Sequence, residues 1–357
     1  IHEQEPGKYD FTGDRDLAHF VSLCQKHGLW VILRPGPYSC AEWEMGGFPW
    51  WLLKDNDIRL RSQDPDFIKP AIRFQREIER QLRPYKLENG GNIIMVQVEN
   101  EFGSYGTDKG YMAELRDSLR SIGWGGVPMF QCDWSSNFEN NALPDLTWTL
   151  NFGSNADVLR EFTRLKELRP DMPLMCSEYW SGWFDGWGQA HQKRSSEPMV
   201  RGIGTMMEHD ISFSLYMTHG GTSFGQWAGA NNTGFVPDCT SYDYDAPIDE
   251  QGNATEKYYQ LREVLQRYSD TRLPAVPKPL PVMAGDNLPE PIESEVVKPM
   301  EMYDHGYGSI IYTTTLPAVG EGSLLRITDM CDYARVYIDG QLIGQLYRGN
   351  GYETTLR

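Results

Sequence analysis

Short, continuously apolar runs alternate with longer segments of helical periodicity between residues 1 and 270. A strand that is apolar on both faces is typical of a parallel sheet covered by helices on both sides. The alternation therefore predicts consecutive βα units. The runs predicted to be strands are 29–34, 92–101, 127–132, 148–152, 173–178 and 212–218. The segments predicted to be helices are 14–27, 65–87, 111–122, 156–168, 198–210 and 255–268.

A closed (β/α)8 barrel is the fold that this alternation favours, and it needs eight strands. The sequence supplies two fewer, and it opens abruptly at Ile1, so we expect the first barrel strands to lie upstream of this residue. The predicted fold class is α/β, with an N-terminally incomplete TIM barrel over residues 1–272.

The composition changes at residue 273. Residues 273–300 are rich in proline, which cannot continue a helix, and this favours a linker. Residues 301–357 contain Tyr- and Thr-rich runs of period two at 309–316, 324–328 and 334–339, with turn signals at 320–322 and 339–340. These runs predict antiparallel β structure, and we expect the start of an all-β, jelly-roll-like sandwich domain.

The composition indicates which kinds of binding partner and cofactor to expect. The net charge is −17, which disfavours nucleic acid or an anionic membrane as a partner. No run of apolar residues is long enough to span a membrane. The 6 cysteines have no metal-site spacing, so we expect no metal, no cofactor and mostly reduced thiols. The aromatic share of 12% fits either core packing or the stacking of rings on sugars.

Glu101 and Glu178 each stand at the end of a predicted strand. Active sites of α/β barrels lie at the carboxyl ends of the strands. Glycoside hydrolysis needs a pair of carboxyl groups there, one to protonate the leaving oxygen and one to attack or to activate water. Taken singly, each glutamate fits a helix cap or a ligand of backbone N–H groups better than a catalytic role, and we expect Glu99 to be structural.

Five long motifs give the chain a family resemblance. It resembles the glycoside hydrolase family 35 β-galactosidases from its start to about residue 260. The stretches that carry the resemblance are RPGPYSCAEWEMGGFPWWL, NIIMVQVENEFGSYG, PLMCSEYWSGWFDGWG, LYMTHGGTSFG and TSYDYDAPIDEQGNATEKY.

The resemblance implies a retaining exo-β-galactosidase that removes terminal non-reducing β-D-galactosyl residues through a covalent galactosyl-enzyme. It implies that Glu101 is the acid/base and Glu178 the nucleophile. The substrate would be a β-galactoside oligosaccharide or glycoconjugate, and the protein would be exported to the periplasm, the extracellular space or the lysosome. The residues that it implies for sugar binding are Cys40, Ala41, Glu42, Asn100, Tyr216 and Tyr244.

Two further expectations concern geometry. A retaining enzyme holds its carboxyl groups about 5–5.5 Å apart, and we predict this separation for Glu101 and Glu178. We also expect Trp183 or Trp187 near the wall of the sugar pocket. Three alternatives stay open: an enzyme for another β-linked sugar such as a β-glucoside, a carbohydrate-binding protein without catalysis, and a purely structural barrel.

Overall fold

The computed structural model describes residues 1–231, 236–276, 290–303, 310–317, 320, 322–328, 333–347 and 353–355. The chain divides into two compact units, Ile1–Pro289 and Glu290–Arg357. The predicted linker, 273–300, lies partly outside the described residues, so the predicted domain bounds stay predictions.

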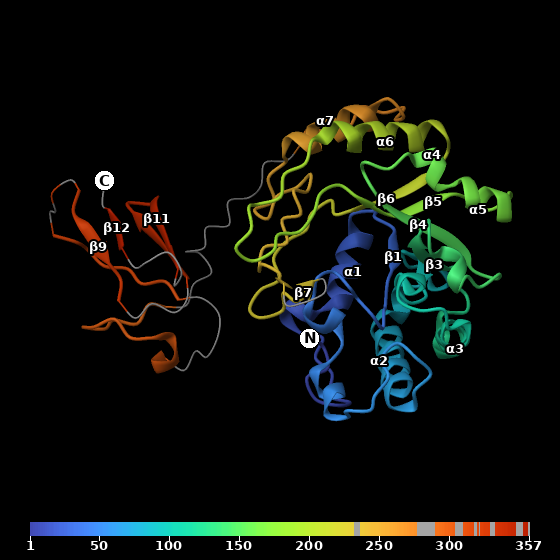
Figure 1. The fold of residues 1–357 in the computed structure, drawn as a ribbon, viewed down its shortest axis with the longest axis horizontal. Coiled ribbons are helices and arrows are strands. Elements are labelled where there is room, and N and C mark those ends of the chain that lie inside the picture. Colours follow the sequence, from blue (N-terminus) through green and yellow to red (C-terminus); the bar gives the residue numbers. More distant parts are fainter. Residues whose placement is uncertain are drawn as a thin grey trace. The chain divides into compact units, whose positions relative to one another are not determined.

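A parallel sheet of six strands forms the centre of the first unit (Figure 1). The strands follow one another in chain order, and every neighbouring pair is parallel. The predicted βα barrel architecture is confirmed as a half-barrel. Within 1–231 and 236–276 its edges, β1 and β6, do not pair with each other. The strands are β1 (Val31–Leu33), β2 (Ile93–Gln97), β3 (Met129–Trp134), β4 (Thr147–Gly153), β5 (Met175–Trp180) and β6 (Ser212–Tyr216).

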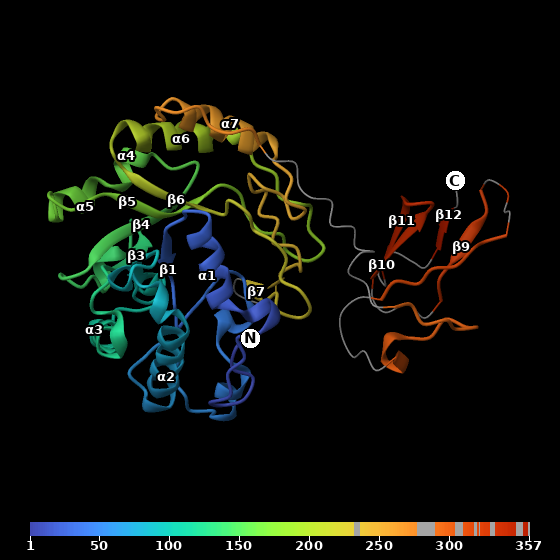
Figure 2. The ribbon, with the colours of Figure 1, turned by 180° about the vertical axis from the view of Figure 1, so that it is seen from behind.

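Helices connect the strands and flank the sheet, and α6 and α7 lie side by side at the periphery in both views (Figures 1 and 2). Aspartate caps explain where two of them begin. Asp64 accepts a hydrogen bond from the amide of Asp66, and Asp108 accepts bonds from Gly110 and Tyr111. The helices are α1 (Leu17–Lys26), α2 (Pro65–Leu82), α3 (Lys109–Leu119), α4 (Val158–Glu161), α5 (Thr163–Leu168), α6 (Ser196–Glu208) and α7 (Glu256–Gln266).

Three predicted helices differ from the structure. The helix predicted over 65–87 ends at Leu82 and is followed by a 3-10 turn, Arg83–Tyr85. The helix predicted over 111–122 ends at Leu119 and continues as a π-helical turn, Arg120–Trp124. The helix predicted over 156–168 is the two short helices α4 and α5, which meet at the fully buried Phe162. Packing of this aromatic ring in the core outweighs the helical periodicity on which the prediction rested.

The apolar core of the unit has two main parts. The first part packs α1, α2 and α3 against β1 and β2, through side chains such as Val21, Phe67 and Leu115. The second packs α4 to α7 against β4 and β5, through side chains such as Phe162 and Ile203. Since the core lies between the sheet and its helices, the carboxyl ends of the strands remain available for polar side chains.

The second unit contains small antiparallel sheets. Strand β9 (Leu324–Arg326) pairs with β12 (Glu353–Thr355), and β10 (Tyr333–Ile338) pairs with β11 (Gln341–Tyr347). Asp339 and Gly340 join β10 to β11 with φ of 47° and 82°, as a tight hairpin turn requires. The strand predicted over 309–316 is wrong at 310–316, which form no strand; residue 309 lies outside the described residues. The Tyr- and Thr-rich run there is largely exposed and has no partner strand among the described residues.

Candidate active site

Polar side chains from several strands meet at one edge of the sheet. Arg34 follows β1, Glu101 follows β2, Asn151 lies near the end of β4, and Glu178 lies in β5. Because the strands are parallel, their carboxyl ends share this edge. All eight predicted site residues lie in this cluster or directly beside it.

Glu178 is held by one charged and one neutral donor. The Arg34 guanidinium donates to its Oε1, and the Trp180 indole N–H donates to its Oε2 at 3.0 Å. The carboxylate is buried, at 6% exposure. Because each of its two oxygens accepts from a different donor, the Glu178 carboxyl group is fixed in orientation.

Glu101 has a different environment. Its Oε1 accepts two N–H donors, Asn151 Nδ2 at 2.8 Å and Trp134 Nε1 at 3.0 Å. Burial, followed by the negative charge of Glu178, raises the pKa of Glu101 to about 7, although the Asn151 bond acts in the opposite direction. A carboxyl group with this pKa can both give and take a proton near neutral pH.

Asn100 is tied to the same network. Its side-chain oxygen accepts Arg34 Nη2 at 2.6 Å and Gln97 Nε2 at 2.9 Å, and Arg34 Nε donates to Gln97 Oε1 at 2.7 Å. The thiol of Cys132 lies 3.5 Å from the same Asn100 oxygen. Since the oxygen of Asn100 is occupied in this way, its amide N–H groups are the part left for other partners.

The loop that carries Glu42 has an unusual backbone. Cys40, Ala41 and Glu42 follow one another with φ of 59°, 58° and 49°, the left-handed region that side chains disfavour. Main-chain bonds hold the loop, because the amide of Gly229 donates to the Glu42 carbonyl at 2.8 Å and the amide of Trp43 donates to the Cys40 carbonyl at 3.0 Å. Strained backbone of this kind clusters at binding and catalytic sites.

Glu42 is a second carboxyl group with a raised pKa. Burial is the main cause that raises its pKa to about 7, and the charges of Asp238 and Glu178 act in the same direction, whereas the hydrogen bond from the Tyr242 hydroxyl acts against them. Burial, followed by the charges of Glu42 and Glu101, also raises the pKa of the Cys40 thiol to about 11. Cys40 and Glu42 therefore lie within range of the charges of the two strand-end glutamates, Cys40 of Glu101 and Glu42 of Glu178.

Tyrosines cover the Glu42 side of the site. The hydroxyls of Tyr216 and Tyr242 are 3.1 Å apart, and Tyr242 also donates to Glu42 Oε2. Tyr244 packs its ring against Tyr216 and Tyr242, with centroids 5.5 and 5.4 Å away. The sequence analysis did not select Tyr242, although the TSYDYDAP motif contains it beside Tyr244.

The two tryptophans expected at the wall differ. The ring of Trp183 lies 6.3 Å from that of Tyr244 and packs against Trp180 as well. Trp187 is 60% exposed.

Glu101 has two hydrogen-bond donors that the sequence did not lead us to select, Asn151 and Trp134. Both lie at or near strand ends, where the rule that found the glutamates also applies.

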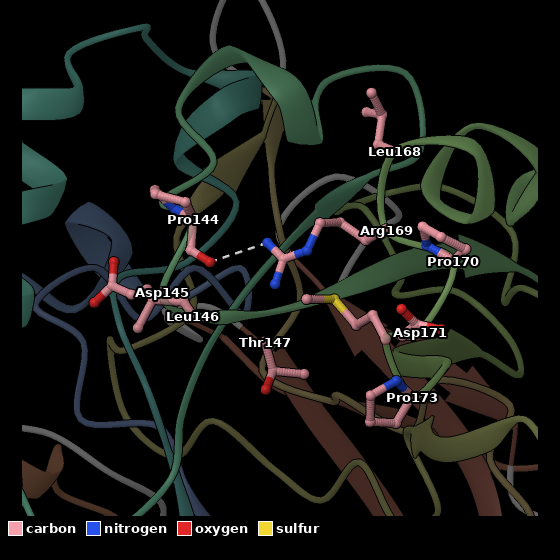
Figure 3. A pocket seen from close by; sticks show the side chains of 10 residues that line it. Pro144, Asp145, Leu146, Thr147, Leu168, Arg169, Pro170, Asp171 and Pro173 are labelled. Carbon is pink, nitrogen blue, oxygen red and sulfur yellow. Dashed lines mark hydrogen bonds between the residues drawn. The ribbon is translucent and has the colours of Figure 1, made fainter.

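A cavity of about 690 Å³ lies elsewhere in the first unit (Figure 3). Its lining includes Leu146 and Thr147 at the start of β4 and Pro173 before β5, so it adjoins the amino ends of these strands. Arg169 donates to the Pro144 carbonyl across it at 3.0 Å. The cavity is therefore separate from the carboxyl-end cluster. No group of His, Cys, Asp and Glu side chains among the described residues could hold a metal ion.

Comparisons with known proteins identify the family. The profile of the glycosyl hydrolases family 35 matches residues 1–268. A β-galactosidase of Xanthomonas manihotis is 39% identical over 97% of this chain and 60% of its own length. A β-galactosidase-1-like protein of Mus musculus is 40% identical over 97% of this chain and 57% of its own. A β-galactosidase of Homo sapiens is 35% identical over 98% of this chain and 55% of its own. The chain thus spans little more than half the length of these relatives.

Proposed function

The chain belongs to family 35 of the glycosyl hydrolases, and from this premise we propose that it is the catalytic part of a retaining exo-β-galactosidase. The observation that supports this most directly is the asymmetry of the two strand-end glutamates. Glu178 is bound by a cation, whereas Glu101 has a pKa raised to about 7 by burial and by Glu178. Such a pair of environments separates a nucleophile from a general acid.

In the proposed first step, Glu178 attacks the anomeric carbon as the glycosidic bond breaks. Glu101 gives its proton to the leaving oxygen, so the aglycone departs as a neutral alcohol. Glu178 loses its charge in the covalent galactosyl-enzyme, which removes the negative charge that favours protonation of Glu101. Glu101 then takes a proton from water, the water oxygen bonds to the anomeric carbon, and Glu178 is released as a carboxylate.

For sugar selection we propose Glu42, Asn100, Tyr216 and Tyr244, together with the backbone of Cys40 and Ala41. The tyrosine cluster around Glu42 supports a closed pocket for one terminal galactose, as an exo-acting enzyme needs. A preference for β-glucosides is the alternative, and rates on nitrophenyl β-galactoside and β-glucoside distinguish the two. A protein that only binds carbohydrate would hydrolyse neither substrate.

Azide rescue tests the assignment of roles. Glu101→Ala should slow the release of poor leaving groups most and spare activated aryl galactosides in the first step. Azide needs no base to attack the galactosyl-enzyme, so it should restore turnover of this variant and give the β-galactosyl azide. If Glu101→Ala instead gives the α-azide, Glu101 is the nucleophile and the two roles are reversed.

Export also stays a proposal, and it rests on the family resemblance alone. The described part of the chain contains no helix that is long and apolar enough to cross a membrane. Fractionation of the source cells, with activity followed in the medium, in the periplasm or in lysosomes, tests it. Activity confined to the cytosol would contradict export.

A further inference from the structure

We propose that Asn151 and Trp134 are positioning residues that confine the acidic proton of Glu101 to its second carboxyl oxygen, Oε2. They would thereby fix which oxygen protonates the leaving group. The inference rests on the proposed function for its catalytic meaning. It goes beyond that function in naming the protonated atom and the residues that select it.

Two donors on one oxygen carry the argument. Asn151 Nδ2 and Trp134 Nε1 both donate to Glu101 Oε1, at 2.8 and 3.0 Å. An indole nitrogen can only donate, so Glu101 Oε1 must accept from Trp134. The two donors fill both acceptor positions of Oε1, so a proton there would displace at least one of them, whereas a proton on Oε2 leaves both bonds intact. The protonated form of Glu101 therefore has its hydroxyl at Oε2.

A buried polar chain fixes the orientation of the Asn151 amide. Ser177 Oγ donates to Asn151 Oδ1 at 2.7 Å, and Thr149 Oγ1 lies 2.6 Å from Ser177 Oγ. Asn151, Thr149 and Ser177 are all buried. A flipped amide would turn its oxygen toward Glu101 Oε1, so that two acceptors would face each other there, and it would require the Ser177 hydroxyl to accept where it now donates. The arrangement therefore holds the amide N–H₂ against Glu101.

The charged and titratable groups around Glu101 come from several elements. Glu178 of β5 and Asp133 of β3 raise its pKa, and Arg34 after β1 lowers it. The thiols of Cys40 and Cys132 also face it. The Asn151 bond favours the ionised form, so its loss should raise the pKa of Glu101 above its value of about 7.

Leaving-group dependence tests the positioning role in the full chain. Asn151→Ala should lower kcat/KM for a galactoside with a poor alkyl leaving group by about 10- to 100-fold, because that reaction needs the acid. A dinitrophenyl galactoside needs little acid and should lose less than about threefold. The alkaline limb of the pH profile should move to higher pH. Equal losses on both substrates with an unmoved limb would show a merely structural role and overturn the proposal.

Two further variants make this test specific. Trp134→Phe keeps an aromatic ring and removes the N–H, so it should change the leaving-group dependence in the same direction by a smaller factor. Asn141→Ala is the matched control, because Asn141 is a buried asparagine that donates to the Gly106 carbonyl at 2.9 Å. It should leave both the leaving-group dependence and the alkaline limb unchanged. If Asn141→Ala reproduced the Asn151→Ala pattern, the proposal would be wrong.

Infrared spectroscopy reads the proton without any substrate. The carboxyl C=O band of protonated Glu101 is the one that Glu101→Gln removes. If the proton is on Oε2, the carbonyl oxygen is Oε1, and loss of a donor in Asn151→Ala or Trp134→Phe should shift this band to higher wavenumber. An unshifted band in both variants would overturn the proposal. Absence of galactoside hydrolysis by the unmodified chain would instead contradict the proposed function and leave this spectroscopic result standing.

Discussion

Two arginine–glutamate pairs stand close together at the carboxyl ends of the strands, and their surroundings differ. Arg61 binds Glu99 with two hydrogen bonds, and their side chains are 6% and 0% exposed. Arg34 binds Glu178 through one nitrogen, and their side chains are 33% and 8% exposed. Tyr111 also donates to Glu99 at 3.0 Å.

The difference lies in how many donors each carboxylate receives. Arg61, Tyr111 and the amide of Asn100 supply four hydrogen bonds to Glu99. Arg34 and Trp180 supply one bond to each oxygen of Glu178. A carboxylate with all its acceptor positions filled is inert, and one with positions left open can still react. The same two residue types therefore form a saturated pair after β2 and, at β5, a pair whose carboxylate keeps open acceptor positions, as the proposed nucleophile needs.

The largest expected effect is on turnover and concerns the Arg34–Glu178 pair. Glu178→Gln should lower kcat for an aryl galactoside on the order of 10⁴-fold or more, because an amide cannot form the galactosyl-enzyme. Its free energy of unfolding should change by less than about 1 kcal/mol, since water reaches Arg34. Steady-state kinetics and urea unfolding measure the two quantities. Substantial residual turnover would remove the contrast between the pairs.

In the Arg61–Glu99 pair, a substitution should affect stability more than turnover. Glu99→Gln should lower the free energy of unfolding by about 3–5 kcal/mol, because it leaves the charge of Arg61 buried without its partner. The matched control is Glu139→Gln, which breaks a similar pair, joined by two hydrogen bonds, between Glu139 and Arg164. The side chains of Arg164 and Glu139 are 51% and 48% exposed. The control should lose less than about 1 kcal/mol. Equal losses in urea unfolding would show that burial does not distinguish the pairs.

The smallest expected effect is the pH dependence of activity and stability that Glu101 confers. Burial and Glu178 raise the pKa of Glu101 from 4.5 to about 7, so kcat/KM should fall about tenfold per pH unit above pH 7. Between pH 4.5 and 7 the folded chain keeps a proton that the unfolded chain releases, so stability should fall as pH rises through this window.

Glu101→Gln should reduce this slope of stability against pH and should not abolish it, because the pKa of Glu42 is also raised to about 7. Thermal unfolding of both proteins across the window measures the difference. A slope that Glu101→Gln leaves unchanged would show that Glu101 is not the raised group.

Much of the fold follows from the sequence, because strands and helices leave local signals. The six strands and their order needed only apolar runs and the geometry of parallel sheets. The same reasoning brought Glu101 and Glu178 to the correct edge of the sheet, although β2 ends at Gln97, before Glu101, and β5 continues past Glu178 to Trp180. The partners of these glutamates needed more. Arg34 and Glu178 are 144 residues apart in the sequence, and a local sequence pattern cannot predict a contact over that separation. Tyr242 illustrates the same limit, since it is one of two tyrosines in a motif and only the fold shows which one binds Glu42.

The bond between Tyr242 and Glu42 joins residues 200 positions apart in the chain. Synthesis on the ribosome adds roughly 5–20 residues per second, so Glu42 emerges roughly 10–40 s before its partner does. During this interval Glu42 has no Tyr242 hydroxyl beside it. Lys257 arrives later still, and it ties Asp245 and the Ser181 carbonyl together at 2.6 and 2.9 Å. The Glu42 side of the site is thus completed late in the synthesis of this unit, after all six strands of its sheet have been made.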